Sequence, residues 1–419
     1  MTDSTVAVPA EKTGRYAQLP RLAGAGYIPL ALFARVPLAM LTIGMLTLVT
    51  ARSGSYAIGG FAAGAVGIGA AVGAPASGYL ADRMGQKRIL LATALINAVL
   101  VGAAVVLSYA TAAFTPAATA LVLAVALVAG ASSPQVGPLS RVRWMALSRR
   151  LPREQRGPLV DTALSMEGTV DEITFVLGPA LVGLLASLVA PWLPLTLAAA
   201  ATLVLVTLFA IHPTQAASAR RVTSHGSPGF VAGERVSWFK VAIPVAGMLC
   251  MGTFFGSSQT ALTAFTGVHG SVDQAGLMYA ILGLSSAVTA LSVAYWPARF
   301  TQPWRWVLVG ALMTVASIGL LLPGSLGGMV VALLLVGLPV GPTMVTVFSI
   351  GGMVAPPQWM GTVMTMLASG IVAGTALGSS VAGSIAQAQG SGPAFLVPIA
   401  ASAVLLVLGV LSTVLLRRR

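Results

Sequence analysis

Four charged side chains interrupt long apolar stretches of the sequence: Arg35 in the first stretch, and Glu167, Asp171 and Glu172 in a later one. A charge near the centre of a bilayer costs about 2.5 to 3.5 kcal/mol on insertion scales, so inside a membrane each would need a partner or a function. With a rise of about 1.5 Å per residue, Arg35 and Asp171 lie roughly 14 Å along their helices from the same membrane face. We therefore expect these two side chains to pair.

The spacing of the three carboxylates divides them between two faces of a helix. Glu167 and Asp171 are four residues apart and share one face, whereas Glu172 is turned away by about 100°. Two like charges at this spacing raise the pKa of one member, which is one way to bring the pKa of a proton carrier close to neutral pH. We predict that Asp171 and Arg35 form the element that couples to protons, with Glu167 and Glu172 beside them.

Two further arginines, Arg141 and Arg143, come where a preceding apolar stretch ends, and we expect one of them to meet Glu167 and form a neighbouring gate. The alternative for all these charges is a static salt-bridge cluster. Arg35 has another alternative role, which is to bind an anionic group of a substrate. Pro29 and Pro37 on either side of it can break the helix and free carbonyl groups near a cavity.

The composition supports a membrane location for these charges. The chain is 57% hydrophobic and 8% charged, with a mean hydropathy of +0.91, which is more apolar surface than a soluble chain of 419 residues can bury. Stretches long enough to cross a bilayer recur twelve times without strand-like alternation, which predicts an all-α integral membrane protein. The expected spans are 27–49, 56–77, 89–109, 117–138, 164–189, 193–211, 241–264, 275–296, 306–322, 328–350, 360–386 and 394–415.

The basic residues distinguish the two sides of the membrane. Twenty-one of the 23 fall on alternate, same-side segments, which leaves Arg52 on the opposite side and Arg35 within a span. The positive-inside rule makes the basic side cytoplasmic, so we expect both chain ends in the cytoplasm of a cell (plasma) membrane protein. We interpret the net charge of +13 as this topology signal and not as a nucleic-acid-binding surface.

A polar stretch rich in Gly, Pro, Ser and Thr follows the sixth span and divides the chain into two halves of six spans. We predict five parts: a cytoplasmic tail (1–25), a six-helix bundle (26–211), a cytoplasmic linker (212–240), a second six-helix bundle (241–416) and a basic end (417–419). A shift of 216 residues aligns the loop after span eight with the loop after span two and matches Arg299 to Arg83 and Gln302 to Gln86. The halves are therefore candidates for parallel repeats.

The loop after span two is Gly78-Tyr-Leu-Ala-Asp-Arg-Met-Gly-Gln-Lys-Arg88. Its glycines predict a helix that stops, turns tightly and restarts, with Asp82 near the N-terminal end of the following helix. In this position the stretch resembles the loop signature of the major facilitator superfamily, G-x-L-a-D-r-x-G-r-k. The matching residues are Gly78, Leu80, Asp82, Arg83, Gly85 and Lys87, and Gln86 replaces a basic residue.

The resemblance implies two pseudo-symmetric six-helix bundles, a cytoplasmic latch at Asp82 and Arg83, and a central cavity lined by the first, fourth, seventh and tenth helices. Gly178-Pro-Ala-Leu-Val-Gly183 is similar to part of the antiporter motif of the fifth helix. Ala126 stands where the family's drug exporters would have a fourth-helix arginine, so their proton-coupling scheme does not carry over directly. Polar residues of the three later cavity helices are candidates for substrate contact, unless they bond their own helix backbone. They are Ser132, Gln135, Ser258, Gln259, Thr343 and Thr346.

Enzyme chemistry has little support in the sequence. The histidines His212, His225 and His269 lack metal-ligand spacing, and no phosphate-binding loop is present, so we predict neither a metal nor another cofactor. We expect a monomeric secondary transporter working by alternating access, a proton-coupled exporter of small, largely apolar compounds. The alternatives are a uniporter or importer of neutral solutes such as sugars or nucleosides, and a non-transporting sensor or scaffold.

Overall fold

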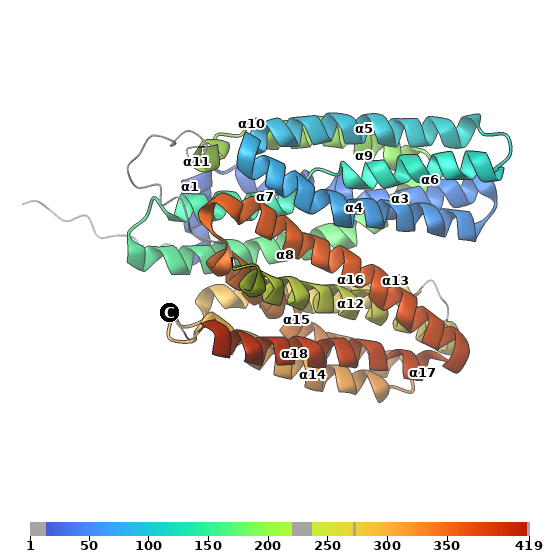
Figure 1. The fold of residues 1–419 in the computed structure, drawn as a ribbon. Coiled ribbons are helices and arrows are strands. Elements are labelled where there is room, and N and C mark those ends of the chain that lie inside the picture. Colours follow the sequence, from blue (N-terminus) through green and yellow to red (C-terminus); the bar gives the residue numbers. More distant parts are fainter. Residues whose placement is uncertain (1–13, 220–236, 271–273, 417–419) are drawn as a thin grey trace, which may run out of the picture.

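The computed structural model describes residues 14–219, 237–270 and 274–416. All regular structure within these ranges is helical (Figure 1). Seven of the basic residues counted for the topology lie outside the described residues: Lys12, Arg220, Arg221, Arg235 and Arg417 to Arg419. His225, considered as a metal ligand, also lies outside them.

Within these ranges, twelve helical segments are long and apolar enough to span a membrane, which confirms the predicted number and order of spans. Spans one, four, six and twelve each consist of more than one helical piece, and spans eight, nine and eleven each include a 3-10 turn: Val293–Tyr295, Gly319–Leu321 and Pro357–Trp359. In order, the spans are α2 (Tyr27–Phe33) with α3 (Val36–Ser53), α4 (Tyr56–Met84), α5 (Gln86–Ala110), α6 (Pro116–Ala131) with α7 (Val136–Ser148), α8 (Arg153–Leu188), α9 (Leu193–Ala201) with a π-helical turn (Thr202–Val206) and α10 (Thr207–Ile211), α12 (Trp238–His269), α13 (Gln274–Ser292), α14 (Gln302–Ile318), α15 (Leu326–Val354), α16 (Met360–Gln389), and α17 (Ser391–Ala394) with α18 (Leu396–Leu416).

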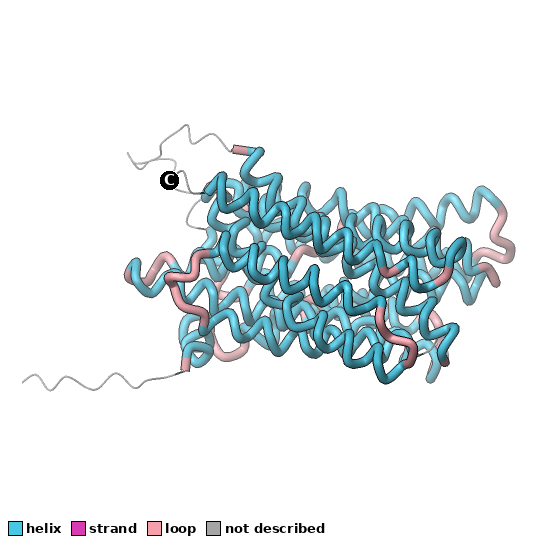
Figure 2. Tube along the Cα trace, turned by 90° about the horizontal axis from the view of Figure 1, so that it is seen from below, coloured by secondary structure: helices cyan, strands magenta, loops and turns pink. Residues whose placement is uncertain are grey.

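Three further short elements of the described chain lie outside the spans. A 3-10 turn (Arg15–Ala17) and α1 (Gln18–Ala23) precede the first span, and α11 (Gln215–Ala219) follows the sixth. In Figure 1 the first six spans occupy the upper part of the molecule and the last six the lower part, and we call these the first and second halves. Helix α1 and the end of α18 lie on the same side, which we call the basic side. Figure 2 shows the loops gathered at the two ends of the helix layer.

Two predicted boundaries were wrong in an informative way. Span four continues as α7 to Ser148, so Arg141 and Arg143 lie inside a helix and not beyond its end. Helix α4 continues to Met84, so Asp82 lies in the last turn of this helix and not at the start of the next. Hydropathy marks only the part of a helix that lies in hydrocarbon, and a helix continues beyond it where its charges find partners.

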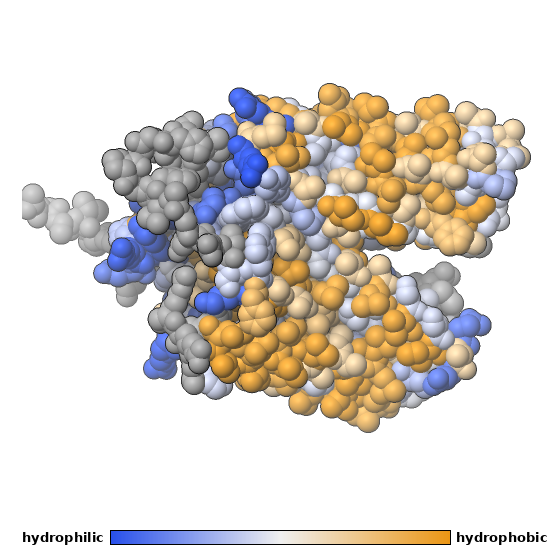
Figure 3. Space-filling view, viewed as in Figure 1, coloured by the Kyte–Doolittle hydropathy of each residue, from blue (hydrophilic) through white to orange (hydrophobic). Residues whose placement is uncertain are grey.

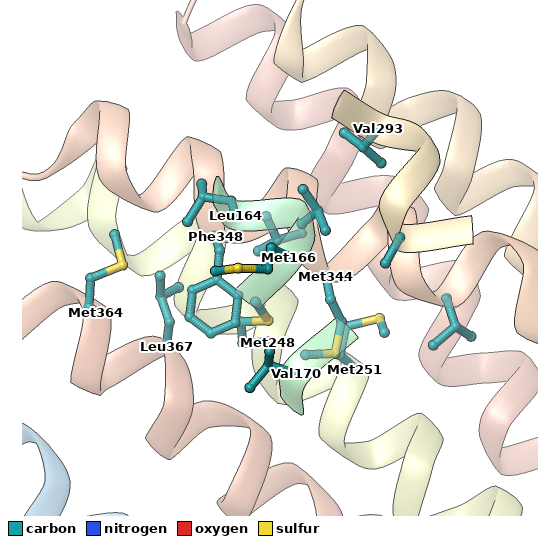
Figure 4. Packing of buried hydrophobic residues seen from close by; sticks show 14 of the residues in the cluster. Leu164, Met166, Val170, Met248, Met251, Val293, Met344, Phe348, Met364 and Leu367 are labelled. Atoms are coloured by element: carbon teal, nitrogen blue, oxygen red, sulfur yellow. The ribbon is translucent and has the colours of Figure 1, made fainter. Parts of the chain in front are cut away.

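The two halves contact each other mainly through the parts of their helices near the basic side. Helix α4 packs against α16, and α8 packs against α13 and α15. The interior of this contact is apolar and rich in methionine, and Figure 4 shows side chains of α8 meeting those of α12, α15 and α16 around Phe348. At the opposite side the surface is hollowed between the halves (Figure 3). Methionine side chains are flexible and fill irregular gaps, so this contact tolerates repacking.

The glycines of spans two and eleven allow backbones to approach closely. A Cβ atom on Gly69 would collide with the carbonyl oxygen of Leu127 in α6, and one on Gly374 with the carbonyl oxygen of Leu249 in α12. Both contacts lie within one half, so these glycines serve packing inside each bundle. Gly78 is different, because a Cβ atom there would meet Thr365 of α16 in the other half.

We expect Gly69→Ala to destabilise the protein by about 1 to 3 kcal/mol, the usual cost of overpacking, because the added methyl group has no room against α6. The matched control is Gly64→Ala on the same helix, where no atom lies within 4 Å of the added carbon. Thermal unfolding in detergent, followed by size-exclusion recovery, compares the two variants. Equal melting temperatures would contradict the packing role.

Candidate functional site

Two of the predicted cavity helices are broken at membrane depth. Span one is interrupted at Ala34 and Arg35, just before Pro37, and span four is interrupted over residues 132–135, which include Pro134. Proline removes a backbone donor and disfavours helix in the residue before it. Asn97 of α5 donates to the carbonyl oxygen of Ala129 at 2.7 Å, close to the second break. Irregular backbone at this depth occurs where it is covered by protein or lines a cavity.

The two breaks meet at a group of four charged side chains. Gly137, in the first turn of α7, lies directly beside this group: a Cβ atom there would be in ordinary contact with Nε of Arg35, at 3.4 Å, and with Oδ1 of Asp171, at 3.5 Å. Arg35 forms ion pairs with Glu167 and, at 2.9 Å, with Oδ1 of Asp171. Arg141 pairs with Oδ2 of the same aspartate at 2.6 Å. We call Arg35, Arg141, Glu167 and Asp171 the four-charge cluster, and its formal charges sum to zero.

A second layer of hydrogen bonds fixes Glu167. Its Oε1 accepts from the hydroxyl of Ser140 at 2.7 Å and from the indole of Trp144 at 2.8 Å. The hydroxyls of Tyr27 and Ser140 share a hydrogen bond of 2.7 Å. Glu167 is fully buried, whereas Asp171 is 15% exposed. Asp171 is therefore the more accessible carboxylate of the cluster, and it bridges two guanidinium groups.

The pairing of Arg35 with Asp171 was predicted correctly from their equal depth, but the predicted partners of Glu167 were wrong. Arg141 bonds Asp171 instead. Arg143 lies two positions along α7 and points elsewhere, because alternate residues of a helix do not share a face. It donates to Gln86 at 3.0 Å, and to the Phe209 carbonyl and Thr214 hydroxyl at 2.8 and 3.1 Å. Arg143 therefore ties α7 to α5 and to the end of span six, and it does not contribute to the four-charge cluster.

The cluster also touches the second half. The guanidinium of Arg141 lies over the ring of Phe348 in α15, 3.9 Å from its centroid. Glu172, as its spacing predicted, points away from the cluster: its Oε1 accepts from the hydroxyl of Ser286 in α13 at 2.7 Å. Any rearrangement of α8 relative to α13 and α15 therefore changes the surroundings of both groups.

Asp82 joins the halves at the basic side. Its carboxylate accepts from the backbone N–H groups of Gly361 and Thr362 at 2.8 and 2.7 Å, and from the Thr362 hydroxyl at 2.8 Å. These groups form the first turn of α16, where the helix dipole favours a negative charge. Arg83 instead lies over the ring of Tyr79 on its own helix, at 4.5 Å. Gly85 ends α4 with a φ of +90°, a conformation that favours glycine.

A second contact between the halves was missed by sequence reasoning. Asp161, in the first part of α8, accepts from Arg305 of α14 at 2.9 Å and from Gln302 at 2.8 Å. The internal repeat pointed to this region, because it equates the junction before α14 with the junction after α4, next to Asp82. In the first half the last turn of α4 supplies the acid, and in the second half the first turn of α14 supplies the base Arg305.

The segment before span one makes a third contact across the halves. Arg15 donates to the carbonyl of Ala294, and the Tyr16 hydroxyl donates to the carbonyl of Leu291 at 2.6 Å. Burial raises the pKa of Tyr16 to about 12, so this hydroxyl remains a donor at physiological pH. The part of the predicted tail that the structure describes is therefore attached to the second half.

The six predicted cavity residues offer few free polar groups. The hydroxyls of Thr343 and Thr346 donate to carbonyls of their own helix at 2.7 Å, and Ser132 does the same at 3.2 Å. Gln135 is buried and donates locally to Ser133. Gln259 is exposed, whereas its neighbour Ser258 is buried and its hydroxyl has no hydrogen-bond partner among the described residues.

A separate groove of about 940 Å³ lies between α13, α14 and α15. Its lining is apolar and includes Leu308, Leu312 and Leu335, whose side chains are exposed on the outer surface of the bundle. None of the predicted site residues lines it. The groove is therefore not the cavity inferred from the sequence.

We expect Arg35→Met to lower stability by about 3 to 5 kcal/mol, because it leaves Glu167 and Asp171 with a single guanidinium in a buried setting. The double variant Arg35→Met/Glu167→Gln restores neutrality and should recover part of the loss. Melting temperatures in detergent test this, with the exposed Arg150→Met as control. A double variant less stable than the single one would contradict charge balance as the cause.

We expect Asp82→Ala to open the basic side. Hydrogen bonds to charged groups contribute about 1.5 to 3 kcal/mol each, and a net loss of about 2 kcal/mol shifts a two-state equilibrium roughly thirtyfold. The measurement is the distance between spin labels on Arg150→Cys and Arg299→Cys, exposed positions of the two halves, in a Cys250→Ser background. Arg83→Ala is the matched control and should leave the distances unchanged. Equal opening by both variants would show that Arg83 shares the latch.

Comparisons with known proteins also identify a membrane transporter fold. A family model described as Major Facilitator Superfamily matches residues 28–370. Comparison with curated protein sequences finds no significant match. Solved structures with the same fold include the human organic anion transporter MFSD10 (TETRAN), at 20% identity and a TM-score of 0.65, with 94% of this chain and 99% of that chain covered.

Two bacterial structures are similar over equally long ranges. A bacterial homologue of the iron transporter ferroportin, in an outward-facing state with soaked iron, is 14% identical with a TM-score of 0.68, covering 92% of this chain and 97% of that chain. The MFS transporter FucP in the outward conformation is 14% identical with a TM-score of 0.65, covering 94% and 98%. At these identities the likeness shows the fold, while the family match extends over most of the chain. The chain therefore belongs to the Major Facilitator Superfamily.

Proposed function

We propose that the protein is a proton-coupled secondary transporter that exports small, largely apolar compounds by alternating access. The observation that carries the proposal is the asymmetry of contacts between the halves. They are joined at the basic side by Asp82, by Asp161 and by the segment before span one, and the surface is hollowed between them at the opposite side (Figure 3). Such an arrangement is one end state of a rocking transporter.

The positive-inside rule assigns the basic side to the cytoplasm, so on this proposal the structure represents an outward-facing state in the plasma membrane. The contacts that close the basic side suit a reversible step. A carboxylate on a helix N-terminus, one ion pair and a methionine-rich contact can each separate without leaving a covalent or metal link to break. The ferroportin homologue and FucP named above were also captured facing outward.

The chemistry of the cavity residues supports an apolar cargo. Most of their hydroxyl and amide groups are already bonded to their own backbone, so few remain to replace the water of a polar solute. Binding would then depend on apolar contact with a few orienting polar groups. The solved structures with this fold include an organic anion transporter, a homologue of an iron transporter and a fucose:proton symporter, which differ in cargo, so the proposed cargo rests on this chain's own residues.

The carboxylates of α8 support proton coupling. Glu167, Asp171 and Glu172 lie within one membrane span, where a carboxyl group is a candidate proton carrier; Glu167 and Asp171 are bound to arginines, whereas Glu172 has no ion pair among the described residues. The proton gradient would be the energy source, and the proposal needs no cofactor. A monomer is sufficient, since both halves of the pathway belong to one chain.

We expect purified protein in liposomes to accumulate small lipophilic cations or neutral dyes against their gradient when a pH gradient is imposed. Accumulation should stop when a protonophore collapses the gradient, while exchange of labelled for unlabelled compound continues. Protein-free liposomes are the control for passive uptake. Downhill flux that does not depend on the pH gradient would contradict proton coupling and would indicate uncoupled transport instead. Absence of flux with every compound would favour the sensor or scaffold alternative.

A further inference from the structure

The carboxylates of α8 differ in how their charges are balanced. Glu167 and Asp171 share two arginines within the four-charge cluster. Glu172 is only 8% exposed, and among the described residues its carboxylate has one hydrogen bond, from the hydroxyl of Ser286, and no ion pair. A buried charge without a partner is costly, whereas a neutral carboxylic acid fits beside a hydroxyl.

The surroundings of Glu172 exclude a cation from the second half. Helices α13 and α15, which pack against α8, contain no Lys, Arg or His over 274–292 and 326–354. The titratable group that faces Glu172 from α13 is Tyr279, and on α8 itself Asp171 is adjacent and already paired. On the first-half side, α7 contributes Arg141, which is bound to Asp171, and α3 contributes Arg52 at its far end.

Glu172 lies within the contact that has to break when the basic side opens. The Thr169 hydroxyl donates to the carbonyl of Ala287 at 3.0 Å, one turn nearer the basic side, and Val176 lies against Gly283 one turn further on. Glu172 and Ser286 are therefore enclosed by the packed helices α8 and α13. If the halves separate there, water reaches the carboxyl group and can stabilise its charge.

Resting on the proposed function, we propose that Glu172 holds the transported proton while α8 and α13 are packed, so that protonation of this residue favours closure of the basic side. The four-charge cluster then stays charged and serves as the framework that holds α8 in place. Closing requires Glu172 to be neutral, and opening to the cytoplasm releases its proton to water. The sign follows: low pH favours the closed basic side, and rising pH weakens it.

The labels at Arg150→Cys and Arg299→Cys, used above for Asp82, test this without a substrate. In the otherwise native chain, the closed fraction should fall as pH rises, with an equilibrium constant that changes by at most about tenfold per pH unit, the limit for one linked proton. Glu172→Gln mimics the neutral acid and should stay closed across the whole range. If the glutamine variant folds poorly, the neutral variant Glu172→Met can be used instead, and its closed fraction should also be independent of pH.

The matched control is Asp161→Asn, which removes a different contact from the same helix. It should lower the closed fraction equally at every pH and leave the slope intact. An unchanged pH dependence in Glu172→Gln would overturn the inference.

A transport measurement distinguishes failure of this inference from failure of the proposed function. In liposomes, Glu172→Gln should keep compound exchange and lose accumulation driven by the pH gradient. If the native protein shows no pH-driven accumulation, the proposed coupling fails, whatever the labels report. If the native protein is coupled and Glu172→Gln remains equally coupled, the proposed function stands and the assignment to Glu172 fails.

Discussion

The cost of an unbalanced charge inside a membrane organises this structure. Arg35 and Arg141 bring two positive charges into the first half, and Glu167 and Asp171 balance them. Both helix breaks lie at this balanced group, because Arg35 sits at one break and Gly137, just after the other, lies beside its guanidinium. Buried ion pairs of this kind add little net stability, but removing one member is expensive. The cluster therefore fixes the relative positions of spans one, four and five more than it strengthens the fold.

Against this fixed first half, the second half is held by contacts of a different kind. The carboxylate of Asp82 rests on the N-terminus of α16, Arg305 reaches Asp161, and methionine side chains fill the space between. Each of these can be replaced by water or lipid contact at modest cost. Rigid bundles joined by a separable interface are what a rocking motion needs, and here the two properties come from two separate groups of residues.

Sequence reasoning recovered what depends on composition and depth. The twelve spans follow from hydropathy, and the pairing of Arg35 with Asp171 follows from the rise per residue, because both are properties of single helices. The partner of Glu167 was wrong because the choice among Arg35, Arg141 and Arg143 depends on how three helices rotate relative to each other. The contact of Asp161 with Arg305 joins residues 144 positions apart in two halves, which no local pattern specifies.

In helix α8, helical periodicity alone could have predicted which of the acids face the second half. Asp161 and Glu172 are eleven residues apart, which is close to three full turns, so they share a face. That face meets the second half through Arg305 and Ser286. Glu167 and Asp171 lie on the other side and meet the first half. One helix thus carries paired acids toward its own bundle, and toward the other bundle it carries Asp161, which is paired, and Glu172, which has no ion pair among the described residues. On the proposed alternating-access mechanism, movement between the halves would change the surroundings of Asp161 and Glu172 directly and would reach Asp171 only through the cluster, which is why the proposal assigns the proton to Glu172.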